Sequence, residues 1–401
     1  MNDATTSGPV SGLEASGAAC LARARALIPL LRTQAAWIDR HGALPPVVLD
    51  AMHEAGMFRM LLPRTFGGME LKPSDFVQCV EAIAMGDGSA AWCMNQGSGC
   101  SMTAAFMAPA VSREIWGGKR DVVAWGQGPG AKAVRTEGGW LATGTYTFVS
   151  GIRHATWLGA HCPCYEADGT RATHADGSNR ELTLLFPRER ITIEANWDVV
   201  GLRGTGSDRF AVTDFFVDEA HAVARESPAE RRESGTLYKF QAMQLYAAGF
   251  ACVGLGIARA AVDAFIELTK HKTQAWSSEA LRDDKAVWRV VGETDGALKM
   301  ARGGLLRTLD DVWDDVARDG ELTLANRIAI RQAATFAIHA ARDVVHTVYH
   351  EAGATAIWAD RPFERLFRDV NTVSQQTQGR RTHFETVGHY LLGGAPDPRW
   401  L

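Results

Sequence analysis

The spacing of apolar residues changes twice along this sequence, and the order of the three patterns restricts the architectures open to the chain. Residues 19–118 carry apolar residues three and four positions apart, for example Leu27, Leu30 and Leu31, as amphipathic helices do. Residues 119–222 hold short runs rich in β-branched and aromatic residues between glycine-containing turns. Residues 236–395 return to helical spacing, and no proline falls between Pro228 and Pro362. We predict an α+β fold with an N-terminal helical domain, a central antiparallel β-barrel or sandwich, and a C-terminal four-helix bundle.

Charge and terminal composition argue against several classes of protein. Lys and Arg total 42 against 46 Asp and Glu, a formal net charge of −4, so overall charge favours neither nucleic acid nor an anionic membrane as a partner. Residues 1–18 are small, polar and rich in Gly and Ser, and we predict that they are disordered. No cation precedes Arg23, so the basic region of a signal peptide is missing. The apolar run 246–262 is interrupted by Arg259 and is predicted to be a buried helix rather than a membrane span.

Cysteine usage points to a reducing compartment. The chain has 7 Cys without a repeated spacing, which does not resemble a disulfide framework. Cys162 and Cys164 follow His161 and form a local cluster of potential metal ligands, but no second Cys/His pair follows at a zinc-site spacing. We predict buried thiols on a strand, no metal site, and a soluble cytoplasmic protein.

Four short strings carry a resemblance to a known family. They are 87–92 (DGSAAW), 148–151 (FVSG), 197–207 (WDVVGLRGTGS), and 353–358 (GATAIW) followed by 362–369 (PFERLFRD). Together with the α–β–α order they resemble the acyl-CoA dehydrogenase superfamily from about residue 20 to residue 395, and the first two strings are most similar to its flavin-dependent monooxygenase branch. The resemblance implies an acyl-CoA dehydrogenase-like fold, FMN or FAD as reduced flavin from a separate flavin reductase, O2, a small-molecule substrate, and a homotetramer with flavin at subunit interfaces.

The resemblance also implies which residues contact the cofactor. Hydroxyls and backbone N–H groups in a glycine-flanked turn are able to meet the edge of a flavin or its phosphate, although each string is also compatible with an ordinary turn. Arg368 and Asp369 are equally compatible with a structural ion pair. The residues expected at the cofactor are Ser150, Gly151, Thr205, Ser207, Arg282, Gly353, Arg368 and Asp369.

By analogy with the same branch, we expect the substrate to contact two aromatic and two amide side chains. They are Trp92, Gln96, Trp125 and Gln127. Aromatic residues in such positions are also common in plain cores.

The catalytic region departs from the family pattern. Acyl-CoA dehydrogenases need a carboxylate base, and the corresponding helix here carries Gln375 and Gln376, whose amides cannot take a proton near neutral pH. The branch often has a His at this place; here the nearest is His383, which is also compatible with a solvated helix position. We predict catalytic roles for Gln375, Gln376 and His383, and a substrate that is already nucleophilic.

The predicted function is the oxygenase component of a two-component monooxygenase that hydroxylates a small aromatic or heteroatom-containing substrate. Two alternatives remain open at this point: an acyl-CoA dehydrogenase-like flavoenzyme that acts on a CH–CH group, and a non-catalytic flavin-binding relative.

Overall fold

The N-terminal part of the chain is helical. The computed structural model describes residues 13–174, 177–225, 227–273, 279–397 and 401. The Ser16 side chain accepts a hydrogen bond from the Ala19 N–H at 3.2 Å and caps the first helix. Residues 17 and 18 are therefore helical, whereas the rest of the predicted disordered tail lies mostly outside the described residues. The helices are α1 (Gly17–His41), α2 (Pro46–Glu54), α3 (Pro73–Ala84), α4 (Gly88–Ser101) and α5 (Pro109–Trp116).

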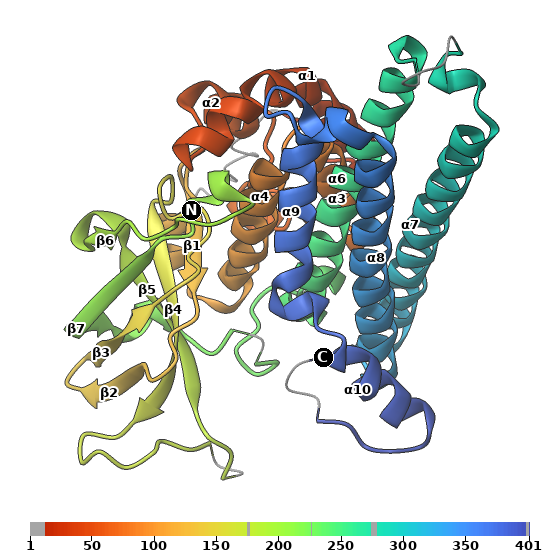
Figure 1. The fold of residues 1–401 in the computed structure, drawn as a ribbon. Helices are drawn as coiled ribbons and strands as arrows, with labels where there is room; N and C mark the ends of the chain where they lie inside the picture. The colour runs from red at the N-terminus through yellow and green to blue at the C-terminus, as the bar shows by residue number, and fades with distance from the viewer. Residues whose placement is uncertain (1–12, 175–176, 226, 274–278, 398–400) are drawn as a thin grey trace.

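A curled sheet follows and lies on the left in Figure 1. Its strands are β1 (Val123–Gly126), β2 (Lys132–Thr136), β3 (Gly139–Tyr146), β4 (Trp157–Tyr165), β5 (Glu181–Pro187), β6 (Ile193–Glu194), β7 (Arg209–Asp218) and β8 (Ala222–Val223). The order is β6-β7-β3-β2-β4-β5-β8, and β1 pairs with β4.

The sheet is mixed rather than purely antiparallel as predicted. The pairs β1–β4 and β2–β4 are parallel, whereas the other pairs are antiparallel. Parallel pairing requires the chain to return to the end of the sheet at which the first strand began, and the segments that connect β1 and β2 to β4 are long enough for this. Cys162 and Cys164 lie fully buried on β4, in agreement with the predicted buried thiols.

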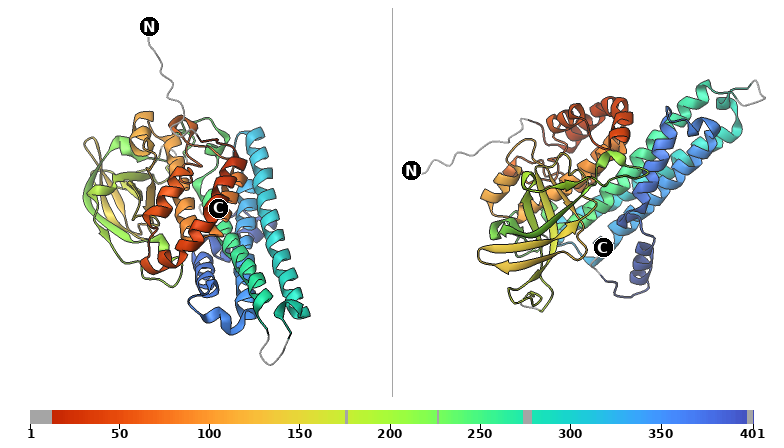
Figure 2. Two further views of the ribbon diagram at one scale, coloured as in Figure 1. Left: turned by 90° about the horizontal axis from the view of Figure 1, so that it is seen from above. Right: turned by 60° about the vertical axis from the view of Figure 1, so that its left-hand side comes forward.

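The C-terminal part forms the predicted helical bundle. Its helices are α6 (Ala242–His271), α7 (Lys285–Asp319), α8 (Leu324–Glu351) and α9 (Pro362–Gln375), followed by the short α10 (Thr382–Leu391). α8 packs against α6, α7 and α9. Both views of Figure 2 show these helices side by side, with the sheet across the molecule from α7 and α8.

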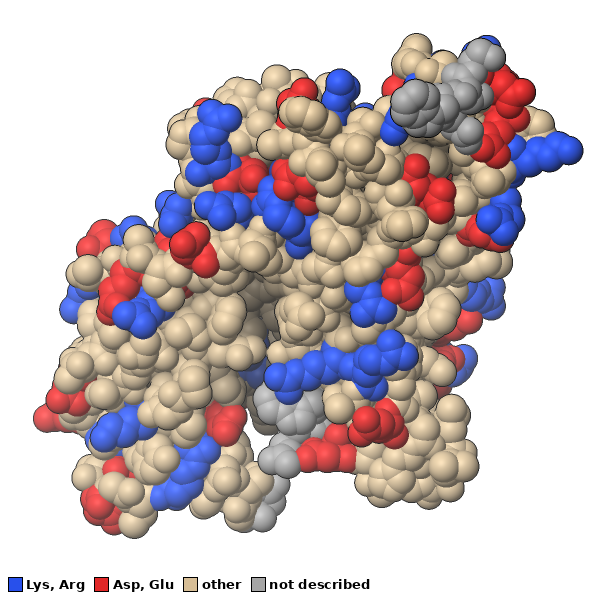
Figure 3. Space-filling view, in the orientation of Figure 1, with Lys and Arg blue, Asp and Glu red and all other residues tan. Residues whose placement is uncertain are grey.

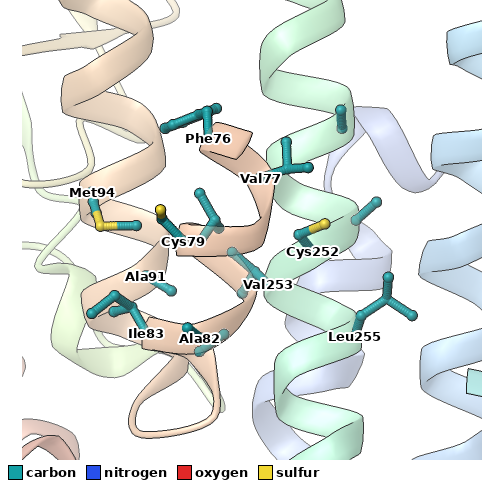
Figure 4. Packing of buried hydrophobic residues seen from close by; sticks show 14 of the residues in the cluster. Phe76, Val77, Cys79, Ala82, Ile83, Ala91, Met94, Cys252, Val253 and Leu255 are labelled. Carbon is teal, nitrogen blue, oxygen red and sulfur yellow. The ribbon is translucent and has the colours of Figure 1, made fainter. Parts of the chain in front are cut away.

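The helix α6 connects the bundle to the N-terminal helices. It packs on α3 and α4 with one side and on α8 and α9 with another. Figure 4 shows this contact, where Cys79 and Ile83 of α3 and Val253 of α6 belong to one hydrophobic cluster. α6 is long and apolar enough to cross a membrane, but 89% of its most apolar window is buried inside the protein. The prediction of a buried core helix is therefore confirmed.

Candidate functional site

A cavity of about 380 Å³ lies where the sheet meets α4, α6 and the end of α9. In the space-filling view of Figure 3 the surface is hollowed between the sheet part and the helices. Aromatic side chains form most of the apolar lining. They are Trp92, Trp125, Phe148, Trp197, Tyr246 and Phe250.

The aromatic wall is held in place by stacking and by indole hydrogen bonds. Trp92 of α4 stacks on Phe250 of α6 with ring centroids 3.9 Å apart. The Trp125 Nε1–H donates to the Tyr246 hydroxyl at 3.0 Å. Burial is the main cause that raises the pKa of Tyr246 well above its ordinary value, so the phenol stays neutral. This wall is a rigid, water-excluding surface suited to a flat ligand.

A row of buried hydroxyls lines the other side of the cavity. The Trp92 Nε1–H donates to Ser150 Oγ at 3.0 Å, Ser150 Oγ lies 2.8 Å from Ser207 Oγ, and Ser207 Oγ lies 2.8 Å from Thr205 Oγ1. Thr205 Oγ1 donates to the Leu202 carbonyl at 2.9 Å. Because a hydroxyl has one hydrogen, the row has one polarity: Ser150 donates to Ser207, which donates to Thr205. Each hydroxyl keeps a lone pair that is able to accept from a ligand N–H.

Left-handed backbone brings this row together. Gly151 has φ +82° and donates its N–H to the Thr205 carbonyl at 2.9 Å, so the two predicted strings lie side by side. Phe148 (φ +57°) and Leu202 (φ +50°) are bulky residues in the same region of φ, and both line the cavity. Such backbone is strained in bulky non-glycine residues and persists only where the surrounding structure holds it.

Asp369 of α9 holds the strained turn from behind. Its Oδ1 accepts from the Leu202 N–H at 2.6 Å, and its carboxylate lies 3.8 Å from Arg365, which also contacts Asp87 at 3.3 Å. Burial, the largest cause, raises the pKa of Asp369 to about 7 against the effect of Arg365, and burial also raises the pKa of Asp87. Two buried acids thus share one guanidinium beneath the cavity.

The end of α9 supplies amide side chains. α9 ends at Gln375, and Gln375, Gln376 and Gln378 all line the cavity. Gln376 Nε2 is buried and has no hydrogen-bond partner among the described residues, whereas Gln375 is exposed. An amide donor without a partner at a cavity wall is available to a ligand.

Six predicted site residues do not line this cavity within the chain: Gly151 and Asp369, which support its wall as described above, and Arg282, Gly353, Arg368 and His383. Arg282 is exposed beside α7, and Gly353, with φ +60°, opens the turn after α8. The sequence was compatible with an ion pair between Arg368 and its neighbour Asp369. In the structure Arg368 instead forms ion pairs with Glu364 and Asp39 and lines a second cavity. His383 is buried, with Nε2 2.8 Å from the Thr377 carbonyl.

His383 is neutral near pH 7, because burial above all lowers its pKa to about 4. It supports the turn that carries Thr377 rather than facing the cavity. Trp92, Gln96, Trp125 and Gln127, in contrast, all line the cavity. Tyr246 and Phe250 were missed, although two aromatic residues four positions apart on one helix face are a usable signal.

Comparison with known proteins places this geometry in a family. The family profile described as "Acyl-CoA dehydrogenase, N-terminal domain" matches residues 25–114, and "Acyl-CoA dehydrogenase, C-terminal domain" matches residues 248–379. The two matches flank the sheet in the family's order and together cover more than half of the chain. The chain belongs to the acyl-CoA dehydrogenase superfamily.

Relatives within the superfamily match over nearly the whole chain. The indole-3-acetate monooxygenase of Pseudomonas putida is 28% identical over 395 residues, 97% of this chain and 99% of the relative. The flavin-dependent monooxygenase oxygenase subunit HsaA of Rhodococcus jostii is 26% identical over 357 residues, 87% of this chain and 91% of the relative. XiaF from Streptomyces sp., solved with FADH2 and glycerol, has a TM-score of 0.85 at 23% identity and covers 95% of this chain and 96% of its own. The predicted superfamily and fold are confirmed.

Proposed function

We propose that this protein is the oxygenase component of a two-component flavin-dependent monooxygenase that hydroxylates a small aromatic substrate. Relatives named as monooxygenases over nearly their full length support this function. The observation that carries it is the lining of the cavity, which contains no Asp or Glu among the described residues. Acyl-CoA dehydrogenation requires a carboxylate to remove the α-proton, so this alternative is disfavoured. The relatives named as monooxygenases disfavour the non-catalytic alternative.

The hydrogen-bonding groups of the cavity fit a reduced flavin. The hydroxyls of Ser150, Ser207 and Thr205 have already committed their protons and offer acceptor lone pairs, and a reduced flavin carries N–H donors that such lone pairs bind. Gln376 Nε2 offers the complementary donor. A bound reduced flavin would supply two electrons to O2, so that one oxygen atom enters the substrate and the other leaves as water.

The chain's own residues would orient and shield the reactants. Trp92 and Phe250 exclude water from the apolar side, which favours productive oxygen transfer over loss of reducing equivalents to solvent. The substrate would lie against the wall formed by Trp92 and Trp125 and hydrogen-bond to Gln96 and Gln127. Because no base lines the cavity, a ring that is nucleophilic without deprotonation is favoured.

We extend the proposal to the assembly. A homotetramer would bring Arg282 and Gly353 of one copy toward the flavin of another, and would cover apolar side chains exposed on the bundle, among them Trp288 at 55% and Phe336 at 56% exposure. Arg368 would support that contact. We also propose that FMN or FAD arrives already reduced from a flavin reductase and that the protein is soluble and cytoplasmic.

The function is tested by mixing the protein anaerobically with reduced FMN or reduced FAD and then adding O2 with an aromatic substrate panel headed by indole and phenol compounds. We expect flavin to bind in the reduced form and a hydroxylated product to form without a reductase present in the vial. Acyl-CoA substrates should leave oxidised flavin unreduced. Flavin reduction by an acyl-CoA, or the absence of any bound reduced flavin, would overturn the proposal.

A further inference from the structure

One charged residue is among those that line the cavity. Of the residues that line it and that the structure describes, Arg380 is the charged one, and all others are uncharged. Arg380 follows the short turn after α9, is exposed to solvent, and has no ion pair or side-chain hydrogen bond recorded within the described parts of the chain. Its guanidinium is therefore available to a ligand at the cavity mouth.

The surroundings of Arg380 strengthen the positive potential at this end. Arg331 of α8 is 1% exposed and its guanidinium donates to the Gln378 side chain, which also lines the cavity. Both cations act on His383: burial is the main cause that lowers its pKa, and the charges of Arg331 and Arg380 lower it further. In Figure 3 basic side chains border the lower edge of the hollow. An anion entering here gains attraction from more than one cation.

The aromatic wall of the cavity suits a flat ring. Trp92 and Phe250 stack with 26° between their planes, and Tyr246 lies against Phe250 with 16° between planes. Aromatic faces favour a planar aromatic guest over an aliphatic chain. The cavity thus has an aromatic wall, where the Arg225 guanidinium already lies 4.6 Å from the centre of the Trp125 ring, and one lining cation, Arg380.

We infer that the substrate is a planar, electron-rich aromatic compound bearing an anionic group such as a carboxylate, and that the Arg380 guanidinium binds this anion while the ring lies among Trp92, Trp125 and Phe250. The inference rests on the proposed function and specifies its substrate. An arginine fork pairs both oxygens of a carboxylate, so the contact also fixes which edge of the ring faces the flavin.

Matched pairs of probes test the charge requirement. Indole-3-acetate is compared with neutral 3-methylindole, and 4-hydroxyphenylacetate with neutral 4-methylphenol, by calorimetric titration of the full chain with reduced FMN bound under anaerobic conditions. In at least one pair we expect the acid to bind roughly ten- to a hundredfold more tightly than the neutral analogue. The preference should shrink with added salt, because the arginine is exposed.

Variants assign the preference to one side chain. Arg380→Ala should abolish the preference for the acid and leave the affinity for the neutral analogue unchanged, and Arg380→Lys should restore part of the preference. Arg381→Ala is the matched control, because Arg381 is the neighbouring exposed arginine and does not line this cavity. Equal affinities within both pairs, no measurable binding of either acid, or a preference that survives Arg380→Ala would overturn the inference.

Product analysis separates this inference from the proposed function. If the wild-type protein hydroxylates 3-methylindole as well as indole-3-acetate with equal kcat/KM, the monooxygenase proposal stands and the role of Arg380 falls. If reduced flavin binds but neither acids nor neutral analogues yield an oxygenated product, both proposals are refuted together.

Discussion

The buried carboxyl of Asp369 makes a quantitative prediction about pH and stability. In the folded protein its pKa is raised from 3.8 to about 7, chiefly by burial, while Arg365 opposes the shift and Asp87 and Asp39 add to it. The folded chain therefore holds a proton that the unfolded chain releases between about pH 4 and about pH 7. A state that holds more protons loses stability as pH rises, so the free energy of unfolding should fall across this window by up to about 4 kcal/mol, at about 1.4 kcal/mol per unit of pKa.

Asp369→Asn removes the titrating proton and keeps an acceptor for the Leu202 N–H. Arg365 retains Asp87 as its partner at 3.3 Å, so the variant buries one cation with one anion. We expect the variant and the wild type to be about equally stable near pH 4, and the variant to be more stable near pH 8 by as much as about 4 kcal/mol.

Urea unfolding at a series of pH values from about 4 to about 8 measures this difference through the midpoint at constant m-value. Asp369→Ala is the control: it also removes the carboxyl but leaves the Leu202 N–H without an acceptor, so it should be about 1–3 kcal/mol less stable than Asp369→Asn at every pH. If the stability curves of wild type and Asp369→Asn run parallel across the range, Asp369 does not hold a proton in the fold and the reasoning from burial is refuted.

Three further predictions concern the cavity and its support. Gln376→Glu places a poorly solvated carboxylate at the cavity wall and should weaken reduced-flavin binding or raise H2O2 release in an oxygen-electrode assay. Gln375→Glu, at an exposed position, should have a smaller effect. Equal effects of the two variants would contradict the placement of the Gln376 side chain at the cavity wall. Tyr246→Phe strips the acceptor from the Trp125 Nε1–H and should cost about 1–3 kcal/mol in chemical unfolding, so unchanged stability would count against that hydrogen bond. Arg368→Ala breaks the half-buried ion pairs with Asp39 and Glu364. It should lower the free energy of unfolding by about 2 kcal/mol, a value between those of exposed and fully buried pairs. A melting temperature equal to that of the wild type would show that the two pairs do not stabilise the fold.

Local patterns were sufficient for the order of elements but not for the pairing of strands. Residues 119–222 were predicted to form short strands and hold β1 to β7, and the apolar run 246–262 was predicted as a buried helix and lies within α6. Within β4, a strand was specifically predicted only at Cys162 and Cys164, because Gly159 and Pro163 interrupt a strand whose burial alternates weakly. The parallel pairs of β4 depend on how distant segments meet, and local spacing carries no information on that.

Candidate site residues were predictable where they belong to a short sequence string typical of the family. They were not predictable where tertiary packing alone determines which residue reaches the cavity. Ser150, Thr205 and Ser207 were named from two strings that the fold joins into one hydrogen-bonded row. Arg380 was not named, because an arginine in a polar turn is usually a solvated surface residue. Its position at the cavity mouth follows from where α9 ends, which is a property of the whole bundle.

The single hydrophobic cluster shared by α3 and α6 has a consequence for biosynthesis. Cys79 and Ile83 of α3 find their partner Val253 only after the entire sheet has been translated. Until α6 emerges from the ribosome, the N-terminal helices carry an uncovered apolar face, the kind of surface that chaperones bind and that drives aggregation of nascent chains. Expression at lower temperature or with added chaperones should therefore raise the soluble yield, and N-terminal fragments that stop before α6 should be recovered mainly as aggregates.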